Sequence, residues 1–324
     1  MRIVRTPTAE EVVDARRVIG RHLAPTPIVR SPALGPNVVL KLETVQPTGS
    51  FKVRGALVAV AKAMAHDRTV PLVTASAGNH GLGVAFAATA YGATATVVVP
   101  ENASAPKRAA LECFDVTLLA TGSSYDEAEA HALSLADAGA TFVSPYNDPD
   151  TIAGQGTIAL ELFDQVPNLR TIIVPIGGGG LISGIALAAT RRPDIRVIGV
   201  EASASPAMLA ALEGDGATEI VVEPTLADGL AGNLEPGSVT IDLVRRHVAD
   251  IVTVTEDEII DAIRFLVREH GLLVEGSGAV GVAALLQHRV AIDGATAVLL
   301  TGRNIAADVI ARLITAPDSG PGRR

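Results

Sequence analysis

Short runs of β-branched and other apolar residues alternate with longer alanine-rich stretches along nearly the whole chain. This alternation predicts an α/β fold with open, mostly parallel sheets flanked by helices. Several runs are apolar at every position, as expected of strands covered on both faces. The strands are expected at 38–42, 72–74, 94–99, 116–119, 171–176, 196–200, 251–254 and 295–300. The helices are expected at 51–65, 79–91, 125–138, 151–165, 181–191, 256–269 and 278–288.

The 324 residues are enough for two closely packed domains, and 48% of them are hydrophobic. Residues 50–145 hold three compact strand–helix units, which predicts a small mobile domain inserted into a larger domain made of 1–49 and 146–316. Thr8 to Glu11 fits a capping box at the start of a first helix. Residues 317–324 have the composition of a disordered tail.

Composition excludes several partners. Only 3% of residues are aromatic, Trp is absent and the net charge is −9, which argues against nucleic acid. No stretch of 18 apolar residues is present, so no membrane partner is expected. Cys113 is the single cysteine and cannot form an intrachain disulfide or a cysteine zinc site, which favours a reducing, cytoplasmic setting.

Four consecutive glycines, Gly177 to Gly180, stand where a buried strand turns into a helix. Backbone without Cβ atoms can approach an anion closely and direct N–H groups at it from the positive end of the helix, so phosphate binding is predicted. Glu201, about 20 residues on, keeps an NAD-linked oxidoreductase open as an outside alternative. However, the third glycine of the dinucleotide fingerprint is replaced by Ser183 or Ile182.

A second turn leads from Gln46 to Lys52, with Ser50 as the expected helix cap and Lys52 in the first turn. A cation there opposes the helix dipole, which favours the neutral amine that Schiff-base chemistry needs. An ordinary surface lysine is the alternative that local spacing favours.

A third turn, from Ser76 to Gly83, offers a hydroxyl, the Asn79 amide and backbone N–H groups at a helix start. Such a loop could bind a carboxylate. His80 is more simply structural than a general base, because no nucleophile with triad logic stands nearby.

Five segments, in order and spacing, resemble the pyridoxal-phosphate (PLP) enzymes of the threonine/serine dehydratase group, which have fold type II. The resemblance extends from about residue 20 to Thr315. The segments are Ser50–Ala56, Ser76–Gly81, Ala153–Thr157, Gly177–Leu181 and Val274–Gly278. The resemblance implies a two-domain fold type II enzyme, with the cofactor held by the larger domain.

The resemblance also implies roles for individual residues. Lys52 matches the Schiff-base lysine, and Asn79 would bond the phenolic oxygen of the cofactor. Thr301 would place a hydroxyl against the pyridine nitrogen. The cofactor-binding set is Phe51, Lys52, Asn79, Gly177, Gly178, Gly179, Gly180, Leu181, Glu275 and Thr301. The loop for the substrate carboxylate is Ser76, Gly78, Asn79 and His80.

The implied activity is that of a PLP-dependent ammonia-lyase, which converts a β-hydroxy L-amino acid to a 2-oxo acid and ammonia by β-elimination. Serine racemases of this fold carry a serine where this chain has Ala77, so racemase activity is the weaker alternative. Arg303 and the segment 228–233 resemble hydroxyectoine-utilisation dehydratases. A cofactor-binding protein without turnover is a third alternative.

This chain lacks two features that some members of the family have, and each difference implies a property of the protein. Members that bind a divalent cation have an Asp six residues after a Glu; here Glu201 is followed by Ala207, so no metal is expected. Only about twenty residues follow Thr301, too few for a fused regulatory domain. We expect a homodimer or a higher homo-oligomer, with an amino acid as the only small-molecule partner.

Overall fold

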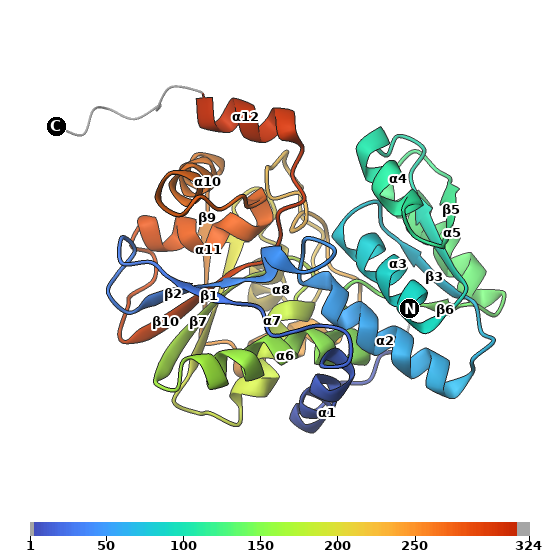
Figure 1. Ribbon diagram of the computed structural model, residues 1–324, viewed down its shortest axis with the longest axis horizontal. Coiled ribbons are helices and arrows are strands. Elements are labelled where there is room, and N and C mark those ends of the chain that lie inside the picture. Colours follow the sequence, from blue (N-terminus) through green and yellow to red (C-terminus); the bar gives the residue numbers. More distant parts are fainter. Residues whose placement is uncertain (1–2, 316–324) are drawn as a thin grey trace.

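Two sheets organise the computed structural model, which describes residues 3–315 (Figure 1). The larger sheet has the strand order β1-β2-β10-β7-β8-β9, and only β1 is antiparallel to its neighbour. Its strands are β1 (Ile28–Arg30), β2 (Val38–Leu42), β7 (Leu169–Pro175), β8 (Arg196–Ala202), β9 (Asp250–Val254) and β10 (Ala295–Leu300). The predicted α/β class with mostly parallel sheets is confirmed.

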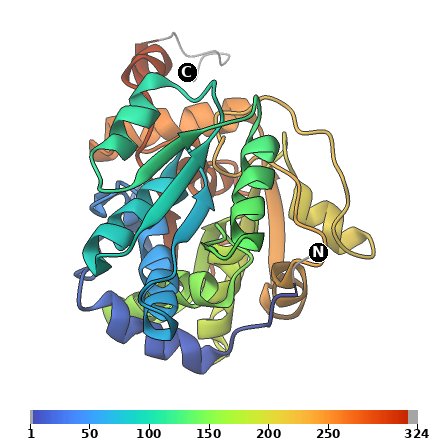
Figure 2. The same cartoon turned by 90° about the vertical axis from the view of Figure 1, so that its right-hand side faces the viewer.

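The smaller sheet is entirely parallel, with the order β5-β4-β3-β6, and faces the viewer in Figure 2. Its strands are β3 (Leu72–Ala75), β4 (Ala95–Val99), β5 (Thr117–Ala120) and β6 (Thr141–Phe142). All four lie within the segment 50–145. The division of the chain into two domains at those boundaries stays a prediction, and the predicted tail at 317–324 lies outside the described residues.

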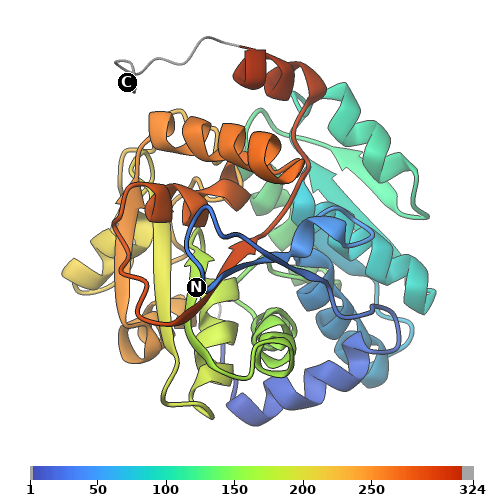
Figure 3. The ribbon, with the colours of Figure 1, turned by 60° about the vertical axis from the view of Figure 1, so that its left-hand side comes forward.

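Helices cover both faces of the larger sheet (Figure 3). The helices α3 (Asn79–Tyr91), α4 (Ala105–Glu112) and α5 (Tyr125–Asp137) pack against the smaller sheet instead. The remaining helices are α1 (Ala9–Ile19), η1 (Glu43–Val45), α2 (Lys52–His66), α6 (Pro149–Gln165), α7 (Gly180–Ala189), α8 (Ala207–Glu213), α9 (Val239–His247), α10 (Glu256–His270), α11 (Gly276–Leu286) and α12 (Ala307–Thr315). The predicted capping box at the start of α1 is confirmed, with Thr8 and Glu11 bonding each other's backbone N–H groups.

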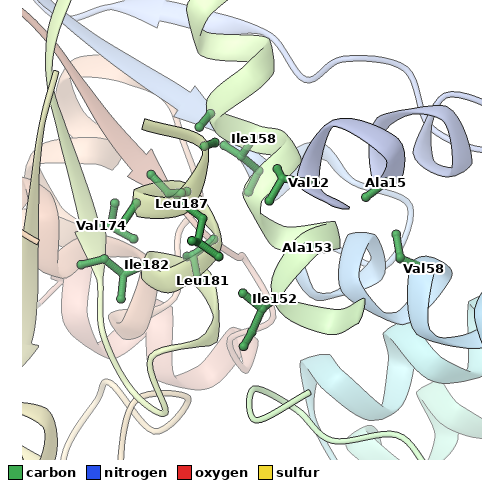
Figure 4. Packing of buried hydrophobic residues seen from close by; sticks show 14 of the residues in the cluster. Val12, Ala15, Val58, Ile152, Ala153, Ile158, Val174, Leu181, Ile182 and Leu187 are labelled. Carbon is green, nitrogen blue, oxygen red and sulfur yellow. The ribbon is translucent and has the colours of Figure 1, made fainter. Parts of the chain in front are cut away.

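The alternating side chains of the strands separate two apolar cores. In β10, Ala297 and Leu299 face a core shared with α6 and α7, whereas Val298 and Leu300 face a core shared with α10 and α11. Figure 4 shows the first core, in which α6 lies between α7 and the helices α1 and α2. Among residues 3–315, no helix is long and apolar enough to span a membrane.

Candidate active site

Strand ends and helix starts meet at one edge of the larger sheet. Because β7 and β10 are parallel neighbours, the glycine turn after Pro175 and the segment after Leu300 leave the sheet at the same edge. The turn into α3 reaches this edge through Asn79, whose Nδ2 donates to Glu275 Oε1 over 2.7 Å. The first turn of α2 reaches it as well, because the Phe51 N–H donates to the Thr301 carbonyl over 3.0 Å.

Lys52 opens α2 with its side chain partly buried. Its Nζ donates to the Pro145 carbonyl over 2.9 Å and lies 5.3 Å from the centre of the Phe51 ring. Burial lowers the pKa of Lys52 to about 8, while the nearby charge of Glu275 opposes that shift. The neutral amine expected from the helix dipole is therefore favoured chiefly by burial, and Lys52 is not a freely solvated surface lysine.

The predicted cap of α2 is wrong. Phe51 occupies the capping position without a side-chain bond, and the buried Ser50 hydroxyl finds no hydrogen-bond partner among residues 3–315. Ser50 instead forms an antiparallel bridge with Gly302, and the Arg303 N–H donates to the Gly49 carbonyl over 2.9 Å. Backbone contacts with the segment after β10 therefore hold the start of this helix.

The glycine turn is packed tightly from within the protein. Gly179 adopts φ +84° at the start of α7, where a side chain would be strained and would meet Met208. A Cβ atom on Gly178 would lie 2.3 Å from the Tyr146 ring, and one on Gly177 would lie 2.9 Å from the Leu230 backbone. These glycines are therefore required by the protein's own packing as well as by any phosphate.

A triangle of polar side chains joins Asn79, Glu275 and Asn304. Asn304 Nδ2 donates to Asn79 Oδ1 over 2.6 Å, and its backbone N–H donates to Glu275 Oε2 over 3.0 Å. Burial raises the pKa of Glu275 to about 7, and the charge of Asp228 adds to that rise. The orientation of the Asn79 amide is fixed by both partners.

The predicted residues of the loop before α3 have two roles: Ser76 and Gly78 are available to a ligand, and His80 is structural. The Ser76 hydroxyl accepts the Gly78 N–H over 3.1 Å and keeps its own proton to donate. A Cβ atom on Gly78 would meet nothing within 4 Å, so space is open there. His80 is buried and its Nε2 bonds the Val143 carbonyl over 2.9 Å; burial lowers its pKa to about 3, so the ring is neutral and structural.

The segment after β10 puts Thr301 in the buried interior beside the α2 start. Arg303 turns away from it, since the exposed guanidinium donates to the Thr44 carbonyl in η1. The unusual arginine of this turn therefore braces the segment before Lys52.

The structure brings most of the predicted site residues to this edge of the larger sheet, linked by the contacts just described. Leu181 is buried in the first turn of α7. Sequence reasoning missed Pro145, Tyr146 and Asn304. Asn304 could have been identified by its position in the turn that begins at Thr301. Pro145 could not, because it acts through its backbone carbonyl, which every residue has.

Helix starts at the site are left without polar side-chain caps. Among residues 3–315, the helices α2, α3, α7 and α11 have no capping side chain and no acidic residue in the first turn. The helix α4 is uncapped as well, whereas α1, α5, α6, α9 and α10 are capped. Uncapped N–H groups bind anions well. A phosphate and a carboxylate therefore find suitable hydrogen-bond donors here, and the Lys52 amine can bind an aldehyde, so the residues fit PLP.

Residues 19–302 match the model of a family described as "Pyridoxal-phosphate dependent enzyme". The chain belongs to this family. It is therefore a PLP-dependent enzyme.

Relatives agree with the family. The chain is 40% identical over 323 residues to an L-threonine ammonia-lyase of Thermotoga maritima, which covers 98% of this chain and 80% of that protein. Among solved structures, maize serine racemase superimposes with a TM-score of 0.89 at 30% identity, covering 95% of this chain and 97% of that one. Threonine deaminase isoform 2 of Solanum lycopersicum superimposes with a TM-score of 0.87 at 29% identity. That superposition covers 96% of this chain and 90% of the other. These PLP enzymes share fold type II with this chain, and the hydroxyectoine resemblance stays a prediction.

Glu201, which matches the first residue of the cation-binding pair found in some family members, caps a helix. Its two carboxylate oxygens accept the N–H groups of Met208 and Leu209, over 2.8 and 2.9 Å, at the start of α8. Burial raises its pKa to about 7. Across residues 3–315, no group of three or more His, Cys, Asp or Glu side chains is arranged to hold a metal ion.

Replacing Glu201 with Gln should flatten the pH dependence of stability. The pKa of Glu201 is raised in the folded state from 4.5 to about 7, so its contribution to stability is present below pH 4.5 and is lost as the pH rises through 7. A shift of that size corresponds to about 3 kcal/mol. The difference in unfolding free energy between wild type and Glu201→Gln should therefore change by that order between pH 5 and pH 8. Exposed Glu213, at the end of α8, supplies the control Glu213→Gln, and equal pH profiles for wild type and Glu201→Gln would contradict the assignment.

Proposed function

We propose that this protein is an L-threonine ammonia-lyase, which converts L-threonine to 2-oxobutanoate and ammonia. The amine of Lys52, with its pKa lowered to about 8 and uncapped helix starts around it, supports the proposal most directly. Threonine is chosen because relatives named for threonine match the chain at up to 42% identity. The reaction removes water from the substrate, and hydrolysis of the resulting enamine returns it, so no co-reactant is needed.

The proposed cofactor contacts follow the geometry of the site. Backbone N–H groups from Gly177 to Leu181 would hold the phosphate, Asn79 the phenolic oxygen and Thr301 the ring nitrogen, with Phe51 and Glu275 beside them. Bound PLP supplies an aldehyde that joins amines and a ring that withdraws electrons from the substrate's α-carbon.

Lys52 is proposed to act as the base that removes the α-proton. A neutral amine close to the substrate can accept that proton directly, and its lowered pKa keeps a useful fraction neutral near pH 8. The substrate carboxylate would be bound by Ser76, Gly78 and the backbone of Asn79 and His80 at the start of α3. The His80 ring itself stays on the Val143 carbonyl and orients the loop.

The test is a product assay on the purified holoenzyme. Ammonia and 2-oxo acid should form from L-threonine and L-serine, and D-threonine should be inert. Formation of D-amino acid without 2-oxo acid would favour the racemase alternative. A chain that binds PLP but turns over no β-hydroxy amino acid would be a cofactor-binding protein without activity.

The rate at which the cofactor-free chain attaches PLP should follow the neutral fraction of Lys52. Because burial lowers its pKa from 10.5 to about 8, that rate should rise about tenfold per pH unit below pH 8 and level off above it. Stopped-flow absorbance of the bound cofactor measures it. A rate still rising between pH 9 and pH 10 would show an unshifted lysine and contradict the burial argument.

Three further properties belong to the proposal. Residues 50–145 form a small mobile domain, supported by a sheet whose strands lie wholly within that segment. The protein acts in the cytoplasm, supported by its single free cysteine, the exposed Cys113. It assembles as a homodimer or larger homo-oligomer, which light scattering on the purified protein tests.

A further inference from the structure

Four charged side chains that sequence reasoning did not connect form a buried cluster, called here the ion cluster: Lys41, Glu43, Arg54 and Glu161. All four are between 0% and 5% exposed. The Arg54 guanidinium makes two bonds to Glu43, both 2.8 Å, and two to Glu161, of 2.6 and 3.0 Å. Such paired bonds fix both the position and the rotation of the guanidinium plane.

The ion cluster is balanced and fully hydrogen-bonded. Lys41 Nζ donates to Glu161 Oε2 over 2.6 Å, to Gln165 Oε1 over 2.9 Å and to the Thr26 carbonyl over 2.8 Å. Burial alone would raise the pKa of Glu43, but the Arg54 charge beside it holds that pKa below its ordinary value. Two cations therefore face two carboxylates.

Stability alone does not account for such a cluster. Well-packed apolar residues of similar volume are often as stabilising as a buried ion pair, because desolvation offsets the attraction between the charges. What the ion cluster supplies is a fixed geometry between three elements: the end of β2 with η1, the first turn of α2, and α6.

Arg54 controls the part of α2 that carries Lys52. Residues two apart on a helix point about 200° apart, so Arg54 faces the interior when Lys52 faces the site. Among the described residues no side chain caps the helix start, and the backbone contacts of Ser50 and Phe51 with the segment after β10 hold only the residues before Lys52. The paired hydrogen bonds of the Arg54 guanidinium to Glu43 and to Glu161 therefore fix the rotation of α2 about its axis. They fix the direction of the Lys52 side chain as well.

The helix α6, which carries Glu161, also connects α2 to the glycine turn (Figure 4). A Cβ atom on Gly154 would lie 2.7 Å from the Arg54 carbonyl oxygen, so the backbones of α6 and α2 touch there. A Cβ atom on Gly156 would lie 2.5 Å from the Gly184 carbonyl oxygen in α7, whose first residue is Gly180. Rigid backbone contacts thus run from Lys52 to the proposed phosphate site.

We propose that Arg54, held by Glu43 and Glu161, is a positioning residue that sets the distance between the Lys52 amine and the glycine turn, so that PLP is held by its phosphate and by Lys52 at once. This rests on the roles proposed above for Lys52 and the glycine turn. Misplacing α2 should weaken covalent attachment and leave the phosphate site intact.

Two ligands separate these effects. PLP carries the aldehyde that joins Lys52 with loss of one water, whereas pyridoxine 5′-phosphate carries an alcohol and binds only non-covalently. We would measure the affinity of the full, cofactor-free chain for both, in wild type, Arg54→Lys and Glu43→Gln. Both variants should bind PLP about 10- to 100-fold more weakly, with pyridoxine 5′-phosphate affinity nearly unchanged. The control is Arg264→Lys, a buried arginine in α10 that donates to the Leu313 carbonyl on the other face of the larger sheet.

Three outcomes of these measurements would contradict the proposals. Equal weakening for both ligands, or no weakening, would make the ion cluster purely structural and overturn the proposal. Failure of both variants to fold, judged by near-ultraviolet circular dichroism, would overturn it in the same way. A wild-type chain without preference for the aldehyde would instead contradict the proposed role of Lys52.

Discussion

Replacing Lys52 with alanine should abolish covalent attachment of PLP and reduce turnover of L-threonine by more than about 10⁴-fold. The same amine is proposed to attach the cofactor and to remove the α-proton, so the substitution should abolish both functions. The Pro145 carbonyl would lose its 2.9 Å donor, a small structural change compared with the chemical one. Steady-state kinetics and mass spectrometry after borohydride reduction measure the two losses.

Lys62 provides a matched control on the same helix. It is exposed near the C-terminal half of α2 and carries no hydrogen bond to the site, so Lys62→Ala should keep wild-type turnover and cofactor content. Peptide mapping of the reduced wild-type protein should place the cofactor on Lys52. A label found on Lys41 or Lys62 instead would refute the assignment.

The parallel strands other than β6 could be predicted from the sequence because they are mainly apolar and 4 to 7 residues long. The strands β1 and β6, of three and two residues, are too short for any periodicity to show. The helices α4, α8, α9 and α12 were missed because each has only seven to nine residues.

Some residues of the candidate site could likewise be identified from the sequence, and others could not. The run of glycines is a local signal, so the glycine turn could be identified from the chain alone. Lys52 could not, because local spacing favours a surface lysine there and only the family resemblance gives it a role. The ion cluster could not be predicted, because Arg54 in α2 and Glu161 in α6 are 107 positions apart and the local sequence around a charged residue does not identify such a distant partner. The Ser50 cap was wrong because a bridge to Gly302, which is remote in sequence, holds that turn instead.

Elimination should exceed racemisation by about 100-fold or more when the holoenzyme acts on an accepted L-amino acid. Racemisation needs a second proton donor that reaches the α-carbon from the side opposite to Lys52. The resemblance assigns that donor to a serine at position 77 in racemases, whereas Ala77 here packs against an apolar cluster that includes Val97 and Leu111. A methyl group has no proton to give, and elimination needs none from it.

The proposed contact of the Thr301 hydroxyl with the ring nitrogen would act in the same direction. A neutral hydroxyl stabilises a protonated ring nitrogen less than a carboxylate would, so charge at the α-carbon is shared less with the ring and loss of the β-hydroxyl competes well. In heavy water, chiral chromatography should find 2-oxo acid far ahead of D-amino acid. Ala77→Ser should raise the D-amino acid fraction about tenfold without changing PLP affinity, and Ala77→Gly, which adds no donor, should not. Comparable amounts of D-amino acid and 2-oxo acid from the unmodified protein would refute both the proton-donor argument and the ammonia-lyase proposal, because a chain lacking that hydroxyl would then have another route to the opposite face.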